Sequence, residues 1–192
     1  MTLTKYLFGH LTGFGLTVAL VTAAADQGTK LWMLATFKGG TSPVTAGRLV
    51  DLLLIPANPA DSFRWSISSF IDLVLTWNTG ISYGLLQQVG PFGQWALLGV
   101  KAIAVLLLWI WLAHATSRLT AVALGLIIGG AIGNAIDRAL HGAVLDFVHF
   151  HITTADWTFS WYVFNLADAA IVAGVIGLLY ESLRARDAAK AP

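Results

Sequence analysis

Four aspartates lie at the ends of long apolar runs or between them, where an ionised side chain is costly. Asp26 and Asp137 stand near the ends of two runs, Asp146 follows in a connection, and Asp168 stands near the start of the last run. A charge at membrane depth costs on the order of 3 kcal/mol on insertion scales, so such acids suggest function or buried ion pairs. For Asp137, a structural pair with Arg138 or with a neighbouring helix is a sufficient explanation. No cation lies near Asp146 or Asp168 in the sequence, so these two are the candidates for chemistry.

Two carboxyl groups held close together can hydrolyse a peptide bond. Like charges a few ångströms apart cannot both ionise cheaply, so one pKa rises and the pair shares a proton. The ionised member takes a proton from water, while the protonated member polarises the peptide carbonyl. If Asp146 and Asp168 meet, this chemistry needs no metal, no cofactor and no covalent intermediate.

The composition indicates a membrane protein that positions these acids with helices. Of the 192 residues, 57% are apolar and only 11% are charged, whereas a soluble domain carries about a quarter charged residues. Four segments reach the length of about 20 mostly apolar residues that a spanning helix needs. These segments are 6–33, 92–113, 119–136 and 161–180. We expect one integral-membrane domain over residues 1–192.

The composition also excludes several kinds of function. The chain has no cysteine, which excludes a thiol nucleophile, a disulfide framework and a cysteine-based metal site. Its net charge is +1, which gives no reason to expect nucleic acid as a partner.

The distribution of basic residues orients the four spans. The basic residues on one side are Lys5, Arg118, Arg184, Arg186 and Lys190. This bias favours cytoplasmic termini, so that the loop 35–91 and the region 138–160 lie outside and the acids gather near the outer interface. A cleavable secretory signal ending at Ala25 is the alternative for the first span. The apolar pattern resumes at Leu31, which favours a retained helix.

The loop between the first two spans carries a β pattern. In residues 65–78 the odd positions are largely apolar and the even positions largely polar, as in a half-buried strand. The apolar run 49–55 suits a strand or a membrane-surface segment, and residues 143–148 look extended. The predicted fold class is an all-α membrane protein with four transmembrane helices and a small extracytoplasmic β element.

Spacing along the helices predicts which faces pack and where polar groups meet. Gly125, Gly129 and Gly133 recur every four residues and end at Asp137. Such stripes let helix backbones approach closely in lipid. Asn134, Asp137 and Arg138 share one helical face, as do Asn165 and Asp168.

Five stretches together resemble the lipoprotein signal peptidase (signal peptidase II) family. They appear in the family's order and span residues 26–168. The stretches are 26–30 (Asp-Gln-Gly-Thr-Lys), 78–84 (Asn-Thr-Gly-Ile-Ser-Tyr-Gly), 129–138 (Gly-Gly-Ala-Ile-Gly-Asn-Ala-Ile-Asp-Arg), 144–147 (Val-Leu-Asp-Phe) and 164–168 (Phe-Asn-Leu-Ala-Asp). Any one alone is a weak signal, whereas five in order are specific.

The resemblance implies a catalytic aspartate dyad, which falls on Asp146 and Asp168. It also implies four transmembrane helices with cytoplasmic termini and a small extracytoplasmic β cradle. The positions that match residues shaping or supporting the site are Asp26, Lys30, Asn78, Gly80, Asn134, Asp137, Arg138 and Asn165.

The same resemblance implies the substrate and the location. The substrate is a prolipoprotein whose cysteine already carries diacylglycerol, and cleavage falls just before that cysteine. The enzyme is expected in the bacterial inner membrane as a monomer surrounded by lipid, with its active site near the outer face. Globomycin-type peptides are expected to inhibit it.

This chain departs from the family pattern in three places. The segments 38–65 and 149–162 look longer than usual, and Ser82-Tyr83 stands where Ala-Phe is commoner. Because both longer segments border the expected substrate entrance, the shape of the cradle is open.

Three rival functions remain as alternatives. Residues 80–84 fit the G-x-S-x-G pattern of serine hydrolases with Ser82 as nucleophile, but that motif needs a reachable histidine and an α/β alternation that is absent here. A Ser/Lys peptidase would use Lys30 or Lys101 instead. His149 and His151 with Asp146 have metal-ligand types, although an extended strand turns Asp146 to the opposite face. A proton or ion transporter would need acids along a path across the membrane, whereas these acids gather at one face.

Overall fold

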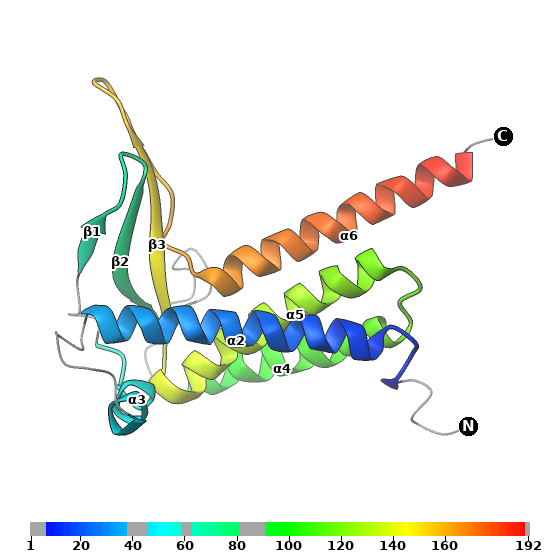
Figure 1. Ribbon diagram of the computed structural model, residues 1–192, viewed down its shortest axis with the longest axis horizontal. Coiled ribbons are helices and arrows are strands. Elements are labelled where there is room, and N and C mark those ends of the chain that lie inside the picture. Colours follow the sequence, from blue (N-terminus) through cyan, green and yellow to red (C-terminus); the bar gives the residue numbers. More distant parts are fainter. Residues whose placement is uncertain (1–6, 38–45, 59–62, 81–90, 191–192) are drawn as a thin grey trace. The chain divides into compact units, whose positions relative to one another are not determined.

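The computed structural model describes residues 7–37, 46–58, 63–80 and 91–190 (Figure 1). Helices predominate, and the strands form one small sheet. In chain order the elements are α2 (Thr12–Phe37), α3 (Ala46–Leu53), β1 (Arg64–Ser66), β2 (Ile71–Asn78), α4 (Pro91–Ala113), α5 (Arg118–His141), β3 (Val144–Thr153), β4 (Thr158–Ser160) and α6 (Leu166–Lys190).

Three helices in the described part of the chain are long and apolar enough to cross a membrane. They are Trp95–Ala113 in α4, Arg118–His141 in α5 and Leu166–Ala185 in α6. The predicted first span is also a helix, α2, which continues over 26 residues to Phe37. Its second half carries Asp26, Gln27 and Lys30, and these polar side chains lower its hydropathy. A membrane crossing by α2 therefore stays a prediction.

The last predicted span begins later than expected. Residues 161–165 lie outside α6, because the segment before this helix pairs with β3 instead. Phe164 and Val148 form an isolated bridge, and each N–H donates to the other residue's carbonyl oxygen at 2.9 and 2.8 Å. Asp168 consequently lies in the first turn of α6.

The sheet is antiparallel throughout, in the order β1-β2-β3-β4. The predicted strand 65–78 is divided into β1 and β2, and residues 143–148 extend into β3 as expected. Between Leu73 and Thr76 the pairing of β2 with β3 shifts register, which increases the local twist just before Asn78. The run 49–55 is helical over most of its length, in α3, so the strand alternative for it was wrong.

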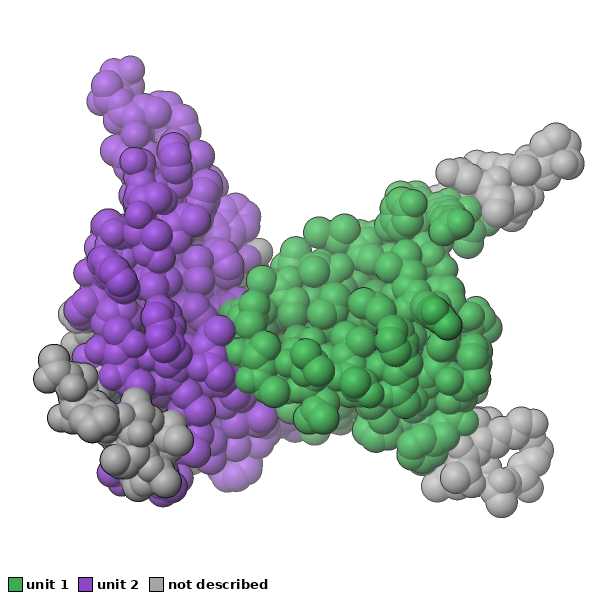
Figure 2. All heavy atoms as spheres, viewed as in Figure 1, with its two compact units in different colours: residues 1–26, 100–133, 166–192 green, residues 27–99, 134–165 purple. Residues whose placement is uncertain are grey.

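The described residues form two compact units, shown in green and purple in Figure 2. Unit 1 comprises residues 1–26, 100–133 and 166–192, and it is helical. Its buried core is formed by Ala19, Leu112, Ala115, Ala121, Leu124 and Ile128.

The glycine stripe of α5 packs against neighbouring helices, as its spacing predicts. A Cβ atom on Gly129 would lie 2.5 Å from the Ala19 carbonyl oxygen of α2, and one on Gly130 would lie 2.5 Å from the Ala167 carbonyl oxygen of α6. Any larger side chain at these positions would force the helices apart. The glycines therefore set how closely α2, α5 and α6 approach within unit 1.

Unit 2 comprises residues 27–99 and 134–165 and contains the whole sheet. Its core is formed by Met33, Leu34, Leu52, Leu73, Leu75, Trp77, Ala143, Leu145 and Phe147. The alternation predicted for residues 65–78 holds at Leu73, Leu75 and Trp77, which are buried as expected. Two even positions, Asp72 and Val74, are buried as well, so both faces of β2 are covered in its central part.

Candidate active site

Asp146 lies near the start of β3 with its carboxylate enclosed by amide groups. Its Oδ2 accepts a hydrogen bond from Nδ2 of Asn78 at 3.0 Å, and its Oδ1 accepts one from Nδ2 of Asn165 at 2.7 Å. The residue is only 3% exposed. Antiparallel pairing explains the first contact, because Asn78 lies at the end of β2 opposite Val144. The carboxylate is therefore held from two sides by side chains that are distant in sequence.

A second layer of polar residues holds these amides in place. Nδ2 of Asn165 also lies 3.0 Å from Oδ1 of Asn134, which in turn accepts a hydrogen bond from Nζ of Lys30 at 3.0 Å. All three side chains are buried. Polar groups in such a place are stable only when each is hydrogen-bonded, so the network fixes one arrangement around Asp146.

Asp137 connects this network to the backbone of β3. Its Oδ2 forms an ion pair with Lys30 at 2.9 Å and accepts the N–H of Leu145 at 2.9 Å. Its Oδ1 accepts a hydrogen bond from Nε2 of Gln27 at 2.8 Å. Of the two pairings open from the sequence, the structure has the one with a neighbouring helix: Lys30 of α2 neutralises Asp137.

Arg138 and Gly80 shape the turn that follows β2. A terminal nitrogen of the Arg138 guanidinium donates to the carbonyl oxygen of Gly80. The N–H of Gly80 donates to Oδ1 of Asn78 at 3.0 Å. Together these contacts hold the Asn78 side chain, whose amide group faces Asp146. Residues 81–90, which include Ser82 and Tyr83, lie outside the described residues.

The remaining two predicted acids belong to unit 1. Asp26 is fully buried in α2, and its Oδ1 accepts the N–H of Ala167 at 2.9 Å. Gly133 leaves room for this carboxylate, because a Cβ atom there would collide with Oδ2 of Asp26. Ala167 is the second residue of α6, and Asp168 follows it, partly buried. The meeting of Asp146 with Asp168, which belong to different units, stays a prediction.

Sequence reasoning gave no separate role to Gln27. The spacing could have indicated a role beside Lys30, because Gln27 and Lys30 are three residues apart on one helix and therefore share a face. Asp72 was missed entirely. The alternating pattern predicts a solvent-facing side chain at this position, whereas Asp72 is 2% exposed.

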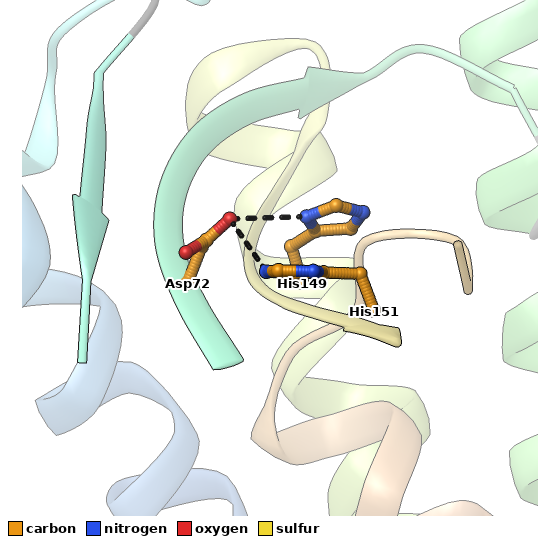
Figure 3. A group of neighbouring side chains, drawn as sticks. All are labelled: Asp72, His149 and His151. Carbon is orange, nitrogen blue, oxygen red and sulfur yellow. Dashed lines mark ion pairs between the residues drawn. The ribbon is translucent and has the colours of Figure 1, made fainter. Parts of the chain in front are cut away.

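Asp72 faces His149 and His151 across the pair β2–β3 (Figure 3). Its Oδ2 lies 3.6 Å from Nδ1 of His149 and 3.2 Å from Nε2 of His151. Hydrogen bonding with the Ser66 side chain lowers the pKa of Asp72, and burial acts in the opposite direction. The two nearby imidazoles lower this pKa further. Donor atoms of these three residues lie within 4.8 Å of one another. The acid that accompanies the histidines is thus Asp72 and not Asp146, which contacts Asn78 and Asn165 instead.

A hollow lies beside this group. It has a volume of about 320 Å³ and is lined by Phe63, Arg64, Val74, Leu75, Thr76, His149 and Val163.

Comparison with known proteins identifies relatives over nearly the whole chain. The family profile described as signal peptidase (SPase) II matches residues 18–184. A lipoprotein signal peptidase of Rhodopseudomonas palustris (strain TIE-1) is 49% identical over 181 residues, which cover 93% of this chain and 96% of that protein. One of Nitrobacter hamburgensis is 51% identical over 178 residues, with the same two coverages.

Two solved bacterial membrane enzymes share the fold. One, determined at 2.3 Å by the in meso method, aligns with a TM-score of 0.67 at 24% identity and covers 94% of this chain and 93% of its own. The other, determined at 1.9 Å by the same method, aligns with a TM-score of 0.64 at 26% identity, with coverages of 92% and 97%. With the family profile and the close relatives, these findings show that the chain belongs to the signal peptidase II family of membrane proteases that process lipoproteins.

Proposed function

We propose that this chain is an intramembrane aspartyl endopeptidase acting on diacylglyceryl-modified prolipoproteins. It cleaves the signal peptide just before the lipidated cysteine, with Asp146 and Asp168 as the catalytic pair. The observation that carries the proposal is the buried carboxylate of Asp146, held by the amides of Asn78 and Asn165. A surface acid needs no such enclosure, whereas a reacting carboxylate must be held in one orientation.

Asp168 is close in sequence to a residue that contacts Asp146. Asn165 contacts Asp146 directly, and Asp168 follows Asn165 by three residues. Three residues of chain span at most about 11 Å between their Cα atoms. This short connection supports the proposal that the two carboxyl groups act as a pair.

In the proposed reaction, one carboxylate accepts a proton from a water molecule whose oxygen attacks the peptide carbonyl carbon. The other carboxyl, protonated at the start, donates its hydrogen bond to the carbonyl oxygen. Collapse of the tetrahedral intermediate breaks the C–N bond, and the new amine takes a proton from the pair. One proton then remains on the pair, as at the start of the cycle. The proposed reaction therefore needs neither metal nor cofactor.

The supporting residues act by fixing each acid. Asp137 binds the N–H of Leu145, which precedes Asp146, and Asp26 binds the N–H of Ala167, which precedes Asp168. Lys30, Asn134, Asn165 and Asn78 then orient the Asp146 carboxylate. Small misplacements of reacting groups cost large factors in rate, so such anchors contribute to catalysis without touching the substrate.

The family and the apolar helices support a location in the bacterial inner membrane. We propose a single-domain monomer with four membrane-crossing helices, cytoplasmic termini, and an active site near the outer face. Lipid surrounds the helices, and globomycin-type peptides block the site. The exposed apolar side chains along the three spanning helices suit this lipid contact; examples are Val100, Ile103 and Leu107 of α4.

The decisive experiment is cleavage of a diacylglyceryl-modified prolipoprotein by purified protein. We expect Asp146→Asn and Asp168→Asn each to lower kcat at least about 100-fold, the scale of general acid–base catalysis. The matched control is Asp156→Asn, since Asp156 is exposed and should keep the wild-type rate. Thermal unfolding in detergent verifies that the variants are folded. Near-normal rates in both variants would refute the dyad.

A further inference from the structure

Asp72, His149 and His151 form a polar group that the proposed reaction does not use. The two histidines alternate with Phe150 along β3, so both side chains point to the same face of the strand. Asp72 lies directly opposite His149 in the antiparallel register. Figure 3 shows both imidazole rings directed at one carboxylate oxygen of Asp72.

Hydrogen bonds leave several polar atoms of this group unsatisfied. Within the described part of the chain, Oδ1 of Asp72, Nδ1 of His149 and Nε2 of His151 are buried atoms without a hydrogen-bond partner. The facing nitrogens lie 3.2 and 3.6 Å from the carboxylate. Buried polar atoms without partners are rare and require an explanation such as an ion.

The distances are compatible with a small metal ion between the three side chains. Zinc with tetrahedral bonds of about 2.0–2.2 Å holds neighbouring ligand atoms roughly 3.3 Å apart. The two observed separations from Oδ2 of Asp72 are 3.2 and 3.6 Å. One ligand atom from each of the three residues lies within 4.8 Å of the other two, so the three side chains are close enough to share one ion.

The surroundings also support ligation. Nε2 of His149 lies 2.7 Å from the hydroxyl of Ser160, which leaves Nδ1 directed at Asp72. A second hydrogen bond of this kind commonly fixes the ring of a metal-bound histidine. The competing cation is Arg64, whose guanidinium lies 3.6 Å from Oδ2 of Asp72. Its side chain is 64% exposed and can move into solvent when another cation binds.

We propose that Asp72, His149 and His151 bind a divalent transition-metal cation of the zinc type, with a fourth position open to water. Two imidazoles and one carboxylate are a ligand set that such ions accept. The ion would link β2 to β3, and through Ser160 also β4. It lies outside the proposed catalytic pair and stabilises the sheet without taking part in peptide hydrolysis.

The test uses the full chain purified in detergent with an affinity tag that contains no histidine. After treatment with a chelator, Co²⁺ is added as a spectroscopic probe. We expect one equivalent to bind, with the intense visible absorption of a four-coordinate site, and Zn²⁺ to displace it. Saturating Zn²⁺ should raise the unfolding temperature, since a ligand that binds only the folded state stabilises it.

Variants then assign the ligands. His151→Gln, His149→Gln and Asp72→Asn should each weaken Co²⁺ binding at least tenfold and abolish the Zn²⁺-dependent rise in unfolding temperature. The control is His114→Gln, which removes an exposed histidine in the turn that follows α4. This variant should bind Co²⁺ like the wild type. If a variant unfolds, the other two still decide the matter.

Equal binding by all variants, or no four-coordinate spectrum in the wild type, would overturn the metal site. Peptidase activity is a separate measurement. Undiminished cleavage after chelation leaves the aspartate mechanism intact whatever the metal titration shows. Loss of cleavage that Zn²⁺ restores would instead contradict a purely structural role for the ion.

Discussion

Unit 1 and unit 2 each contain a buried helical aspartate that accepts a backbone N–H just before a proposed catalytic acid. In unit 2, Asp137 of α5 binds Leu145 at 2.9 Å, and Asp146 follows. In unit 1, Asp26 of α2 binds Ala167 at 2.9 Å, and Asp168 follows. In both units, therefore, a buried carboxylate accepts a backbone N–H. This hydrogen bond fixes a strand in unit 2 and the start of a helix in unit 1.

The contacts that the structure describes for the two anchors differ. Asp137 has the ammonium group of Lys30 at 2.9 Å and the amide of Gln27 at 2.8 Å. The carboxylate of Asp26, which extends from α2, contacts the start of α6. The N–H groups of a first helical turn carry partial positive charge. A strand end offers no such field, because strand dipoles largely cancel. At the start of β3 the positive charge comes from the buried ammonium group of Lys30.

The largest expected effect follows from removing that lysine. Lys30→Met keeps the length of the side chain but leaves Asp137 buried without its ammonium partner. Breaking a buried pair from one side costs about 3–5 kcal/mol, so the unfolding temperature and cleavage should both fall strongly. The measurement is thermal unfolding in detergent together with the prolipoprotein assay.

The double variant Lys30→Met/Asp137→Asn sharpens this prediction. It removes both charges and keeps an oxygen that accepts the N–H of Leu145. We expect it to be more stable than Lys30→Met alone, since no charge is left buried. If the double variant is no more stable, Lys30 acts through packing rather than through charge.

A smaller effect is expected when each anchor alone loses its charge. Asp26→Asn keeps an oxygen for the N–H of Ala167 and should cost about 1–2 kcal/mol, the scale of one charge-assisted hydrogen bond at a helix start. Asp137→Asn should cost more, about 3 kcal/mol, because Lys30 then remains buried without its carboxylate. Unfolding of the two variants side by side is the measurement. Equal losses would contradict the proposed difference in charge balance.

The smallest effect is expected at Gln27. Gln27→Ala removes one donor to Asp137 but leaves the ion pair and the Leu145 contact. We expect a loss of about 1 kcal/mol and a change in kcat of no more than a few-fold. A drop in activity as large as that of Asp146→Asn would mean that Gln27 serves the reaction itself.

Local patterns in the sequence predicted the helical part of the molecule. Apolar length located the helices, because a spanning helix needs many consecutive apolar residues. The four-residue spacing of Gly125, Gly129 and Gly133 predicted a packing face, and the structure places backbone or side-chain atoms of α2 against each position. Both properties depend on neighbours within a few turns of the same helix.

Motif order likewise predicted most of the polar network around Asp146. Asn78, Asn134 and Asn165 were selected as supporting residues, and all three lie in the same hydrogen-bonded network. What the spacing left open was the partner of Asp137. The ion-pair partner of Asp137 is Lys30, which lies on a helix more than a hundred residues earlier in the chain.

The long apolar helices and four of the buried or partly buried acids were predictable from local patterns, since periodicity and apolar length are local properties. The pairings between distant segments were not. Asp72 lies opposite His149 because of the register of β2 with β3. Residues 161–165 lie outside α6 because Phe164 in this segment pairs with Val148 of β3. The helix α3, the partner of Asp137 and the late start of α6 depend on contacts between distant segments. A local pattern carries no information about which distant segment satisfies a buried group.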